Sequence, residues 1–498
     1  MSKTLAGTGV ADEILVGGRW RAGRGSPLRP VNPATGEVLA EIRGADPDNV
    51  DEAAAAGLAA AEDPGWRDLL PHQRARYLYR IGELIDRDAE RLAAIQTANT
   101  GKTLTETRAL VASAAGTYRF FAAALETQEF ALTPSRGDYL SLSVHEPIGV
   151  VGAITPWNSP IASDAQKVAP ALAAGNAVLL KPAQWTPLVA LAVGRLAMEA
   201  GLPPGLLSVL PGSGPVVGDA IVRHPDVGKV SFTGGTDTGR AIGRRAAEKI
   251  MPVTLELGGK SPTIVFPDAD LGHALAGVLF GIFSSSGQAC VAGSRVFVHE
   301  SIYDDFVGRL VKEAGRLRIG PGTEPGAQVG PLVTAAHRDA VAARVDVARA
   351  EGGNVLCGGA VPGEAALASG SYYLPTVIDG LPNAARTCQA EIFGPVAVVL
   401  PFAGEDDLVH QANDTVFGLA CGIWTADYRR AWRVARRIKA GTVWVNTYKQ
   451  LSVSTPFSGM KDSGIGTEKG RSGILSYTRQ KSIYFGLNEA PLPWAGVG

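Results

Sequence analysis

The spacing of hydrophobic residues predicts a chain in which strands and helices alternate. Five short apolar runs predict strands at Val150–Ile154, Ala177–Leu180, Leu206–Leu210, Val230–Phe232 and Val253–Leu255. Amphipathic segments between them predict helices near 163–173, 187–200, 215–222 and 237–250. This order is typical of βαβ units in a doubly wound parallel sheet, the architecture that binds dinucleotides.

Other regions carry different patterns. The first 45 residues are typical of short strands and turns. From Arg74 to Ile95 the apolar residues are spaced for one buried helix face. After Ser261 a second alternation begins, with a strand at Thr263–Phe266 and a helix near Leu271–Phe283. We expect this alternation to form a separate domain that runs to about residue 460.

Two segments predict strands that belong to neither of these regions. Leu140, Leu142 and Val144 alternate with polar residues between about 138 and 146, which is the period of a half-exposed strand. The run Lys481–Leu487 near the C-terminus is the second. If these strands stayed single they would expose unpaired sheet edges.

Composition excludes several classes of function. A chain of 498 residues is too long to fold around one hydrophobic core, so we expect two or three domains. A composition of 46% hydrophobic and 19% charged residues is typical of a soluble globular protein. Lys+Arg 47 against Asp+Glu 48 favours neither a nucleic-acid nor a membrane partner. Four cysteines without a C-x-x-C pair, and seven histidines without a ligand pattern, argue against a metal site and a disulfide framework. The start lacks a secretory apolar core, and we expect a cytoplasmic protein.

Two glycine-rich runs hold the candidate chemistry. Cys290 lies among small residues in Ser284–Arg295, so a substrate can reach its sulfur, although most cysteines in apolar surroundings are buried and inert. Glu256 lies 34 residues upstream (290 − 256) in Leu255–Lys260, where it is either a residue of a turn or a base that activates water. Asn158 follows Pro156-Trp157 directly after a predicted strand.

Together these runs resemble the active-site signatures of the NAD(P)-dependent aldehyde dehydrogenase superfamily, and the resemblance covers nearly the whole chain. Glu391–Pro395, Asn446 and Lys461–Gly466 add to it. It implies an α/β fold with a Rossmann-type dinucleotide-binding domain, an α/β catalytic domain and a small β oligomerisation flap. The expected domains are 1–126 with 148–258 for the dinucleotide, 259–460 for catalysis, and 127–147 with 478–490 for a homodimer or homotetramer.

The resemblance implies oxidation of an aldehyde to a carboxylate. Cys290 would attack as a thiolate and form a thioester, with Asn158 and the Cys290 N–H as donors to the oxyanion. Glu256 would activate the hydrolytic water, and Glu468 is similar to a family glutamate linked to it. One alternative is a CoA-acylating dehydrogenase, against which Glu256 counts. The other is a catalytically silent binding protein that has kept the fold.

The resemblance also implies that NAD, and possibly NADP, binds the chain. Gly234, Gly235 and Gly239 match a phosphate turn at a helix start, although Gly235 stands where serine is common. Lys181 would bind the adenine-side ribose and Glu391 the nicotinamide ribose. Gln184 departs from the usual glutamate, which predicts NAD⁺ use with measurable NADP⁺ use. The remaining expected cofactor contacts are Thr155, Pro156, Trp157, Gly214, Phe232, Leu257 and Phe393.

By the same resemblance three segments line the aldehyde tunnel, and in this chain their residues are largely polar where many family members have aromatic or large apolar side chains. Its expected lining is Ser159, Ser163, Ser284, Lys449, Leu451 and Phe457, with Asp164, Gln166, Ser285, Ser286 and Gln450 beside them. Hydroxyl groups in a closed tunnel cost desolvation unless the ligand pairs with them, which predicts a polar or semialdehyde-like substrate. The alternative is that the serines widen the tunnel for a bulky ring. Three roles remain open for Lys449: it pairs with a substrate carboxylate, it reaches solvent, or it binds Asp164.

Overall fold

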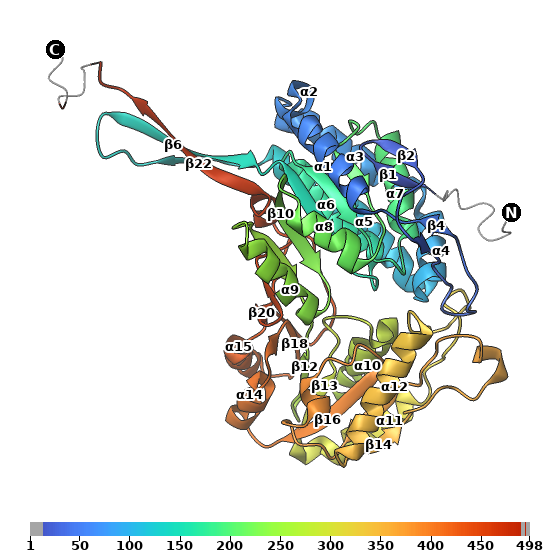
Figure 1. Ribbon diagram of the computed structural model, residues 1–498. Helices are drawn as coiled ribbons and strands as arrows, with labels where there is room; N and C mark the ends of the chain where they lie inside the picture. The colour runs from blue at the N-terminus through green and yellow to red at the C-terminus, as the bar shows by residue number, and fades with distance from the viewer. Residues whose placement is uncertain (1–12, 490–493, 495–498) are drawn as a thin grey trace.

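The computed structural model describes residues 13–489 and residue 494, and consists of two α/β bodies with a projecting arm (Figure 1). The first body is built on an eight-stranded sheet. Its strands, in spatial order, are β2 (Arg19–Arg21), β1 (Ile14–Val16), β9 (Leu207–Val209), β8 (Ala177–Lys181), β7 (Val150–Ile154), β10 (Val227–Thr233), β11 (Val253–Glu256) and β21 (Gly464–Ile465). The five strands from β9 to β11 are parallel, and antiparallel strands flank them on both sides. The parallel sheet predicted from the sequence is therefore confirmed.

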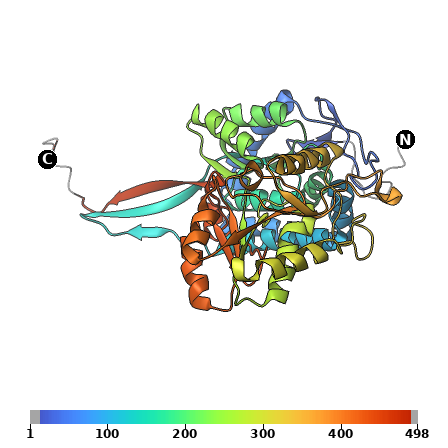
Figure 2. The same ribbon diagram turned by 90° about the horizontal axis from the view of Figure 1, so that it is seen from below.

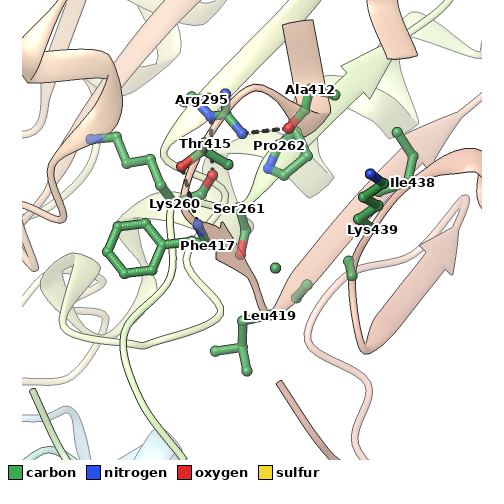
Figure 3. A pocket seen from close by; sticks show the side chains of 13 residues that line it. Lys260, Ser261, Pro262, Arg295, Ala412, Thr415, Phe417, Leu419, Ile438 and Lys439 are labelled. Carbon is green, nitrogen blue, oxygen red and sulfur yellow. Dashed lines mark hydrogen bonds between the residues drawn. The ribbon is translucent and has the colours of Figure 1, made fainter. Parts of the chain in front are cut away.

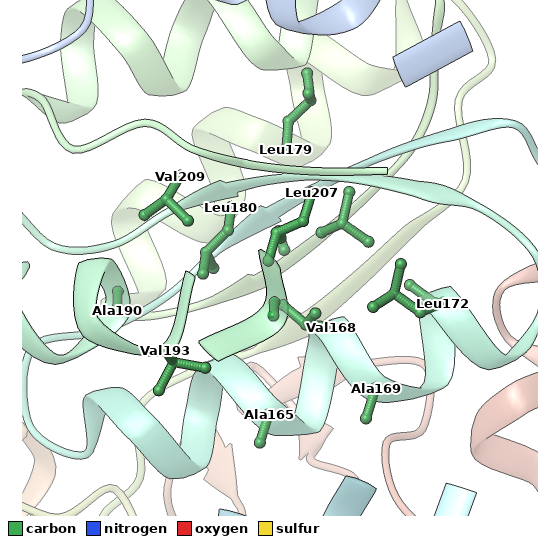
Figure 4. Packing of buried hydrophobic residues seen from close by; sticks show 14 of the residues in the cluster. Ala165, Val168, Ala169, Leu172, Leu179, Leu180, Ala190, Val193, Leu207 and Val209 are labelled. Carbon is green, nitrogen blue, oxygen red and sulfur yellow. The ribbon is translucent and has the colours of Figure 1, made fainter. Parts of the chain in front are cut away.

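Helices cover this sheet. They are α1 (Pro47–Glu62), α2 (Pro64–Arg67), α3 (Pro71–Arg87), α4 (Ala89–Thr100), α5 (Leu104–Glu126), α6 (Pro160–Ala173), α7 (Leu188–Glu199), a π-helical turn at Gly214–Gly218, α8 (Asp219–Arg223), α9 (Thr236–Ala247) and α16 (Ser472–Leu475). Figure 4 shows α6 and α7 packed on β8 and β9, with Val168 and Leu172 of α6 turned toward Leu180 and Leu207. These strands are buried along their whole length, which explains why their sequences are continuous apolar runs without alternation.

The helical pattern expected from Arg74 to Ile95 is confirmed, but the segment is divided between two helices, α3 and α4. The break lies at Asp88, which ends α3 and precedes α4 with φ −97° and ψ 15°. The Asp88 carboxylate accepts hydrogen bonds from Arg87 at 2.7 Å and from Arg91 at 2.6 Å. Aspartate has a low helix propensity, and here it binds arginine side chains at the point where one helix ends and the next begins, whereas the apolar spacing continues across the break.

The second body has a seven-stranded sheet. Its strands, in spatial order, are β14 (Asn354–Cys357), β15 (Thr376–Asp379), β16 (Val396–Phe402), β13 (Arg295–His299), β12 (Pro262–Val265), β18 (Ala420–Trp424) and β19 (Thr442–Val445). All neighbours are parallel except β14 and β15. Its helices are α10 (Leu271–Phe283), α11 (Tyr303–Ala314), α12 (Ala335–Ala350), α13 (Arg386–Gln389), α14 (Glu405–Asn413) and α15 (Tyr428–Arg437). The predicted helix at Leu271–Phe283 is confirmed. Two separate two-stranded sheets are formed by β3 (Pro27–Leu28) with β4 (Ile42–Arg43) and by β17 (Phe417–Gly418) with β20 (Met460–Lys461).

The arm is a three-stranded antiparallel sheet that projects from the first body (Figures 1 and 2). It consists of β5 (Ala131–Thr133), β6 (Tyr139–Pro147) and β22 (Thr478–Gly486), and β6 pairs with β22 along its full length. The two strands predicted near 138–146 and 481–487 therefore pair with each other. The domain limits given above remain a proposed division, and residues 1–12 and 490 lie outside the described part of the chain.

Candidate active site

A cleft of about 910 Å³ lies at the carboxyl ends of the parallel strands of the first sheet and reaches Cys290 of the second body. Ligands bind open α/β sheets at this edge, and the volume lies within the range of small-molecule sites. The expected cofactor residues that line it are Thr155, Pro156, Trp157, Lys181, Gln184, Gly214, Phe232, Gly234, Gly235, Leu257, Glu391 and Phe393. The candidate oxyanion donor Asn158 lines it too. The sequence pattern therefore brings residues from both bodies to one cavity.

Gly239 is the expected cofactor residue that does not line the cleft. It lies on the buried side of α9, where a Cβ atom built on it would stand 2.3 Å from Leu257 Cδ2. The glycine therefore lets α9 pack closely on the strand end, and its expected contact with the cofactor is corrected to a packing role.

The cleft is also lined by residues that the sequence reasoning missed, among them Trp185, Arg245 and His337. His337 lies in the first turn of α12, and its Nε2 is 2.8 Å from the backbone oxygen of Phe393. Its ring packs edge-on against Trp157, with ring centroids 5.2 Å apart. Phe393 has a φ of 57°, and this hydrogen bond holds the strained turn after Glu391. No local pattern in the sequence links His337 to a turn 56 residues later.

A tight turn at Ser284–Gly287 follows the end of α10 and leads to Cys290. We call the segment Ser284–Cys290 the cysteine turn. Ser285, Ser286 and Gly287 all have positive φ, and a Cβ atom on Gly287 would lie 2.0 Å from the Gly394 oxygen. Burial, together with the nearby carboxylates of Glu391 and Glu256, raises the pKa of the Cys290 thiol to about 12. The cysteine is therefore a protonated thiol in this structure, so forming the expected thiolate requires a proton acceptor.

Asn158 lies in the loop between β7 and α6, four residues after the end of β7, and its side chain reaches across to the cysteine turn. Its Nδ2 donates a hydrogen bond of 2.9 Å to the backbone oxygen of Gln288, two residues before Cys290. An amide nitrogen carries two N–H groups, so one orients the side chain while the second is left for another acceptor. This geometry fits the expected oxyanion donor.

Glu256 ends β11 and is almost fully buried. Neither carboxylate oxygen has a hydrogen-bond partner among the described residues. Burial raises the pKa of Glu256 well above its ordinary value, and the nearby charge of Glu468 raises it further. Glu468 forms a buried ion pair with Lys167 and accepts a hydrogen bond from Ser231 at 3.1 Å. The link between Glu468 and Glu256 that the resemblance implied is thus electrostatic.

Glu391 lies at the floor of the cleft and accepts a hydrogen bond of 3.1 Å from the Gly259 N–H. Burial raises the pKa of Glu391 to about 7. Lys181 ends β8, and burial lowers the pKa of its ammonium group to about 8. Asn446 does not line the cleft. Its side chain exchanges two hydrogen bonds with Thr425, which ties the ends of β18 and β19 together.

The three serines before Cys290 have different partners. Ser284 Oγ accepts a hydrogen bond of 2.8 Å from Lys449 Nζ, and Ser285 Oγ donates one of 3.0 Å to Glu106. Ser286 Oγ donates to the Gly330 oxygen and is buried. The hydroxyl of Ser286 is therefore already satisfied within the protein.

Two of the remaining substrate expectations are corrected. Asp164 is buried inside α6, and Lys449 pairs with Ser284 instead of Asp164. Burial raises the pKa of Asp164 to about 7. Leu451 is 48% exposed. Phe457 packs in the apolar cluster beside Cys290, whereas Ser159 and Ser163 are half-buried at the start of α6.

A second, much smaller cavity of about 10 Å³ lies behind the site, between β12 and the segment that follows α14 (Figure 3). Buried Arg295 crosses it and donates to the backbone oxygens of Lys260 and Ala412, at 3.0 and 2.7 Å. The volume suits about one water molecule. Arg295 therefore joins segments of the second body and takes no part in the cleft.

Within residues 13–489, no group of three or more His, Cys, Asp or Glu side chains is placed to hold a metal ion. No helix in that range is long and apolar enough to cross a membrane.

Known proteins are similar to this chain in both sequence and fold. A betaine aldehyde dehydrogenase from Cereibacter sphaeroides is 42% identical over 473 residues, covering 94% of this chain and 96% of that protein. A phenylacetaldehyde dehydrogenase from Pseudomonas fluorescens is 40% identical over 492 residues, covering 96% and 97%. The structure of a betaine aldehyde dehydrogenase from Staphylococcus aureus in complex with NAD⁺ has a TM-score of 0.96 and 35% identity, covering 98% and 97%. The structure of a Bacillus cereus aldehyde dehydrogenase in complex with NAD⁺ has a TM-score of 0.93 and 38% sequence identity, with 96% of each chain covered. The aldehyde dehydrogenase family model matches residues 20–483, and the chain belongs to that family.

Proposed function

We propose that the chain oxidises an aldehyde to a carboxylate with NAD⁺ through a thioester on Cys290. The observation that carries the proposal is that one cleft joins the glycine-rich start of α9, Asn158 and the Cys290 turn. The curated relatives, both aldehyde dehydrogenases, support it, and so do the neighbours solved with NAD⁺.

Each residue has a role that its surroundings allow. Cys290 gives its proton to a water molecule in the cleft and attacks the carbonyl carbon, whose π electrons move onto the oxygen. The Asn158 amide together with the Cys290 N–H stabilises this oxyanion. When bound, NAD⁺ supplies the acceptor for the hydride that leaves the tetrahedral adduct on sulfur. Glu256 then takes a proton from the water that attacks the thioester, which releases the carboxylic acid and restores the thiol.

The residues of the cleft fit a dinucleotide. Gly234 and Gly235 precede α9, where backbone N–H groups and the helix dipole favour a pyrophosphate. Built Cβ atoms on Gly214 and Gly235 would meet open space, so these glycines leave room for a ligand. Lys181 and Glu391 would hold the two ribose groups. A neighbouring cavity of about 740 Å³, lined by Gln184 and three arginines, supports additional use of NADP⁺.

The test uses reduced-cofactor absorbance with NAD⁺ and a panel of aldehydes. Cys290→Ala should abolish turnover while cofactor binding stays largely intact. Glu256→Gln should give one burst of reduced cofactor and then stall at the thioester. Full steady-state activity of Cys290→Ala would refute the role of the cysteine. Turnover that requires added CoA would favour the acylating alternative instead.

We further propose a polar substrate and a homodimer or homotetramer. The hydroxyl of Ser284 and the ammonium group of Lys449, close to the cysteine turn, support the first. The arm supports the second, because several of its apolar side chains are more than half exposed, as Leu132 and Phe485 are.

A further inference from the structure

A cluster of charged side chains surrounds the cysteine turn outside the cofactor cleft. Its members are Lys102, which precedes α5, Glu106 in the first turn of α5, and Lys449 in the loop after β19. None of the three lines the cleft, whereas Cys290 does. The cofactor side of Cys290 is thus separate from the side that bears these charges, and an aldehyde must approach from the side that the cofactor leaves free.

The cluster is fixed to the turn by hydrogen bonds. Glu106 accepts from the backbone N–H and the hydroxyl of Ser285, and from Thr103 at 3.0 Å. Lys449 Nζ donates to Ser284 Oγ at 2.8 Å and lies 5.7 Å from the centre of the Phe280 ring. Lys449 itself has a φ of 55°, an uncommon conformation for a lysine and one that tends to persist at ligand sites.

The charges of the cluster do not balance. Two ammonium groups face one carboxylate, which leaves one positive charge. Neither Lys102 nor Lys449 has a carboxylate within ion-pair distance in the described part of the chain. Lys102 is only 5% exposed, so water provides little compensation. A site in which partly buried ammonium groups outnumber the carboxylates near them is suited to an anionic ligand.

We infer that the aldehyde oxidised at Cys290 carries a carboxylate, which Lys449 binds with the help of Lys102. The inference rests on the proposed function and narrows its substrate class. Aldehydes with a quaternary ammonium group, the substrate class named in the betaine aldehyde dehydrogenase relatives, should be disfavoured here because like charges repel.

The charge state of Lys449 sets a pH dependence. Removal from water, together with the charge of Lys102, lowers the pKa of Lys449 to about 7, although Glu106 acts in the opposite direction. The other group facing it is Cys290, whose thiol is uncharged near neutral pH. Lys449 is therefore charged below about pH 7 and loses its charge above it. Selectivity for an anionic aldehyde should fall as the pH rises through 7.

Two pairs of probes isolate charge from size. Succinic semialdehyde is compared with its methyl ester, and betaine aldehyde with 3,3-dimethylbutanal, by kcat/KM at pH 6.5 and pH 8. The anion should exceed its ester, and the cation should fall below its neutral isostere, each by about tenfold at pH 6.5. Lys449→Met should remove the first difference and Lys449→Arg should keep it. Exposed Lys312→Met on α11 is the matched control and should change neither.

A binding measurement separates this inference from the proposed function. Calorimetry with succinate, which needs no turnover, should show affinity lowered about tenfold by Lys449→Met and unchanged by Lys312→Met. If no aldehyde reduces NAD⁺ but succinate binds in this way, the proposed function fails and the anion site stands. Equal kcat/KM for the acid and its ester in the wild type, or succinate affinity that ignores Lys449, overturns the inference.

Discussion

At the scale of single residues, the protonation state of the buried carboxylate of Glu256 controls the hydrolysis step that we propose. Glu256 has no hydrogen-bond partner in the described residues, and burial together with Glu468 raises its pKa. A general base works only when it is deprotonated, so thioester hydrolysis should accelerate as the pH rises through the raised pKa of Glu256.

Glu468→Gln tests this electrostatic link. Removing the negative charge should lower the pKa of Glu256, so hydrolysis should reach its plateau at a lower pH than in the wild type. Ser231→Ala retains the charge of Glu468 and serves as the control. The rate of acyl-enzyme breakdown, followed across pH by rapid quench, measures the midpoint. A midpoint that stays in place or moves upward in Glu468→Gln contradicts the link.

Gln184 gives a second prediction at the same scale. It lies where the cleft meets the cavity lined by Arg24, Arg29 and Arg43. A neutral amide does not repel a 2′-phosphate, so NADP⁺ should support measurable turnover. Gln184→Glu should raise the KM for NADP⁺ about tenfold and leave the KM for NAD⁺ within about twofold. The prediction is wrong if the wild type rejects NADP⁺ and the substitution changes nothing.

Among the elements, α9 depends on a single small residue for its close packing. Gly239→Ala places a methyl group 2.3 Å from Leu257 Cδ2, so either the helix or the leucine must move. We expect a loss of about 1–3 kcal/mol in the free energy of unfolding and a higher KM for NAD⁺. Gly243→Ala is the control on the same helix, because its methyl group would meet Leu255 at an ordinary 3.8 Å. Urea denaturation compares the two, and equal stability would contradict the packing role.

The elements also show what the sequence could and could not predict. Hydrophobic runs located β7, β8 and β11 closely, because strands buried on both faces have a simple pattern. The break at Asp88 was missed because apolar spacing continues across it. His337 was missed because its partner lies in a distant turn. Asp164 was misplaced because a polar residue in an expected tunnel segment does not reveal which face of the helix it occupies.

On the scale of the whole molecule, the arm is the part that we expect to govern assembly. Its strands leave sheet edges and apolar side chains open, which an identical arm or sheet edge can cover. We expect light scattering at micromolar concentration to report a dimer or tetramer. Leu132→Glu on β5 should shift the mass toward the monomer, whereas Val361→Glu, an exposed change away from the arm, should not. A wild-type protein that is only monomeric would overturn the expectation.

The order in which the chain is made has a consequence for this fold. Strand β21 pairs with β11 beside Glu256, and β22 pairs with β6, so the last strands of the chain complete sheets begun more than 200 and 300 residues earlier. During synthesis, Glu256 and strand β6 therefore leave the ribosome before Glu468 and β22 have been made. Contacts between such distant segments form slowly, because a long loop must close first. Until β22 has paired with it, strand β6 presents an open sheet edge, which is the kind of edge on which partly folded chains associate.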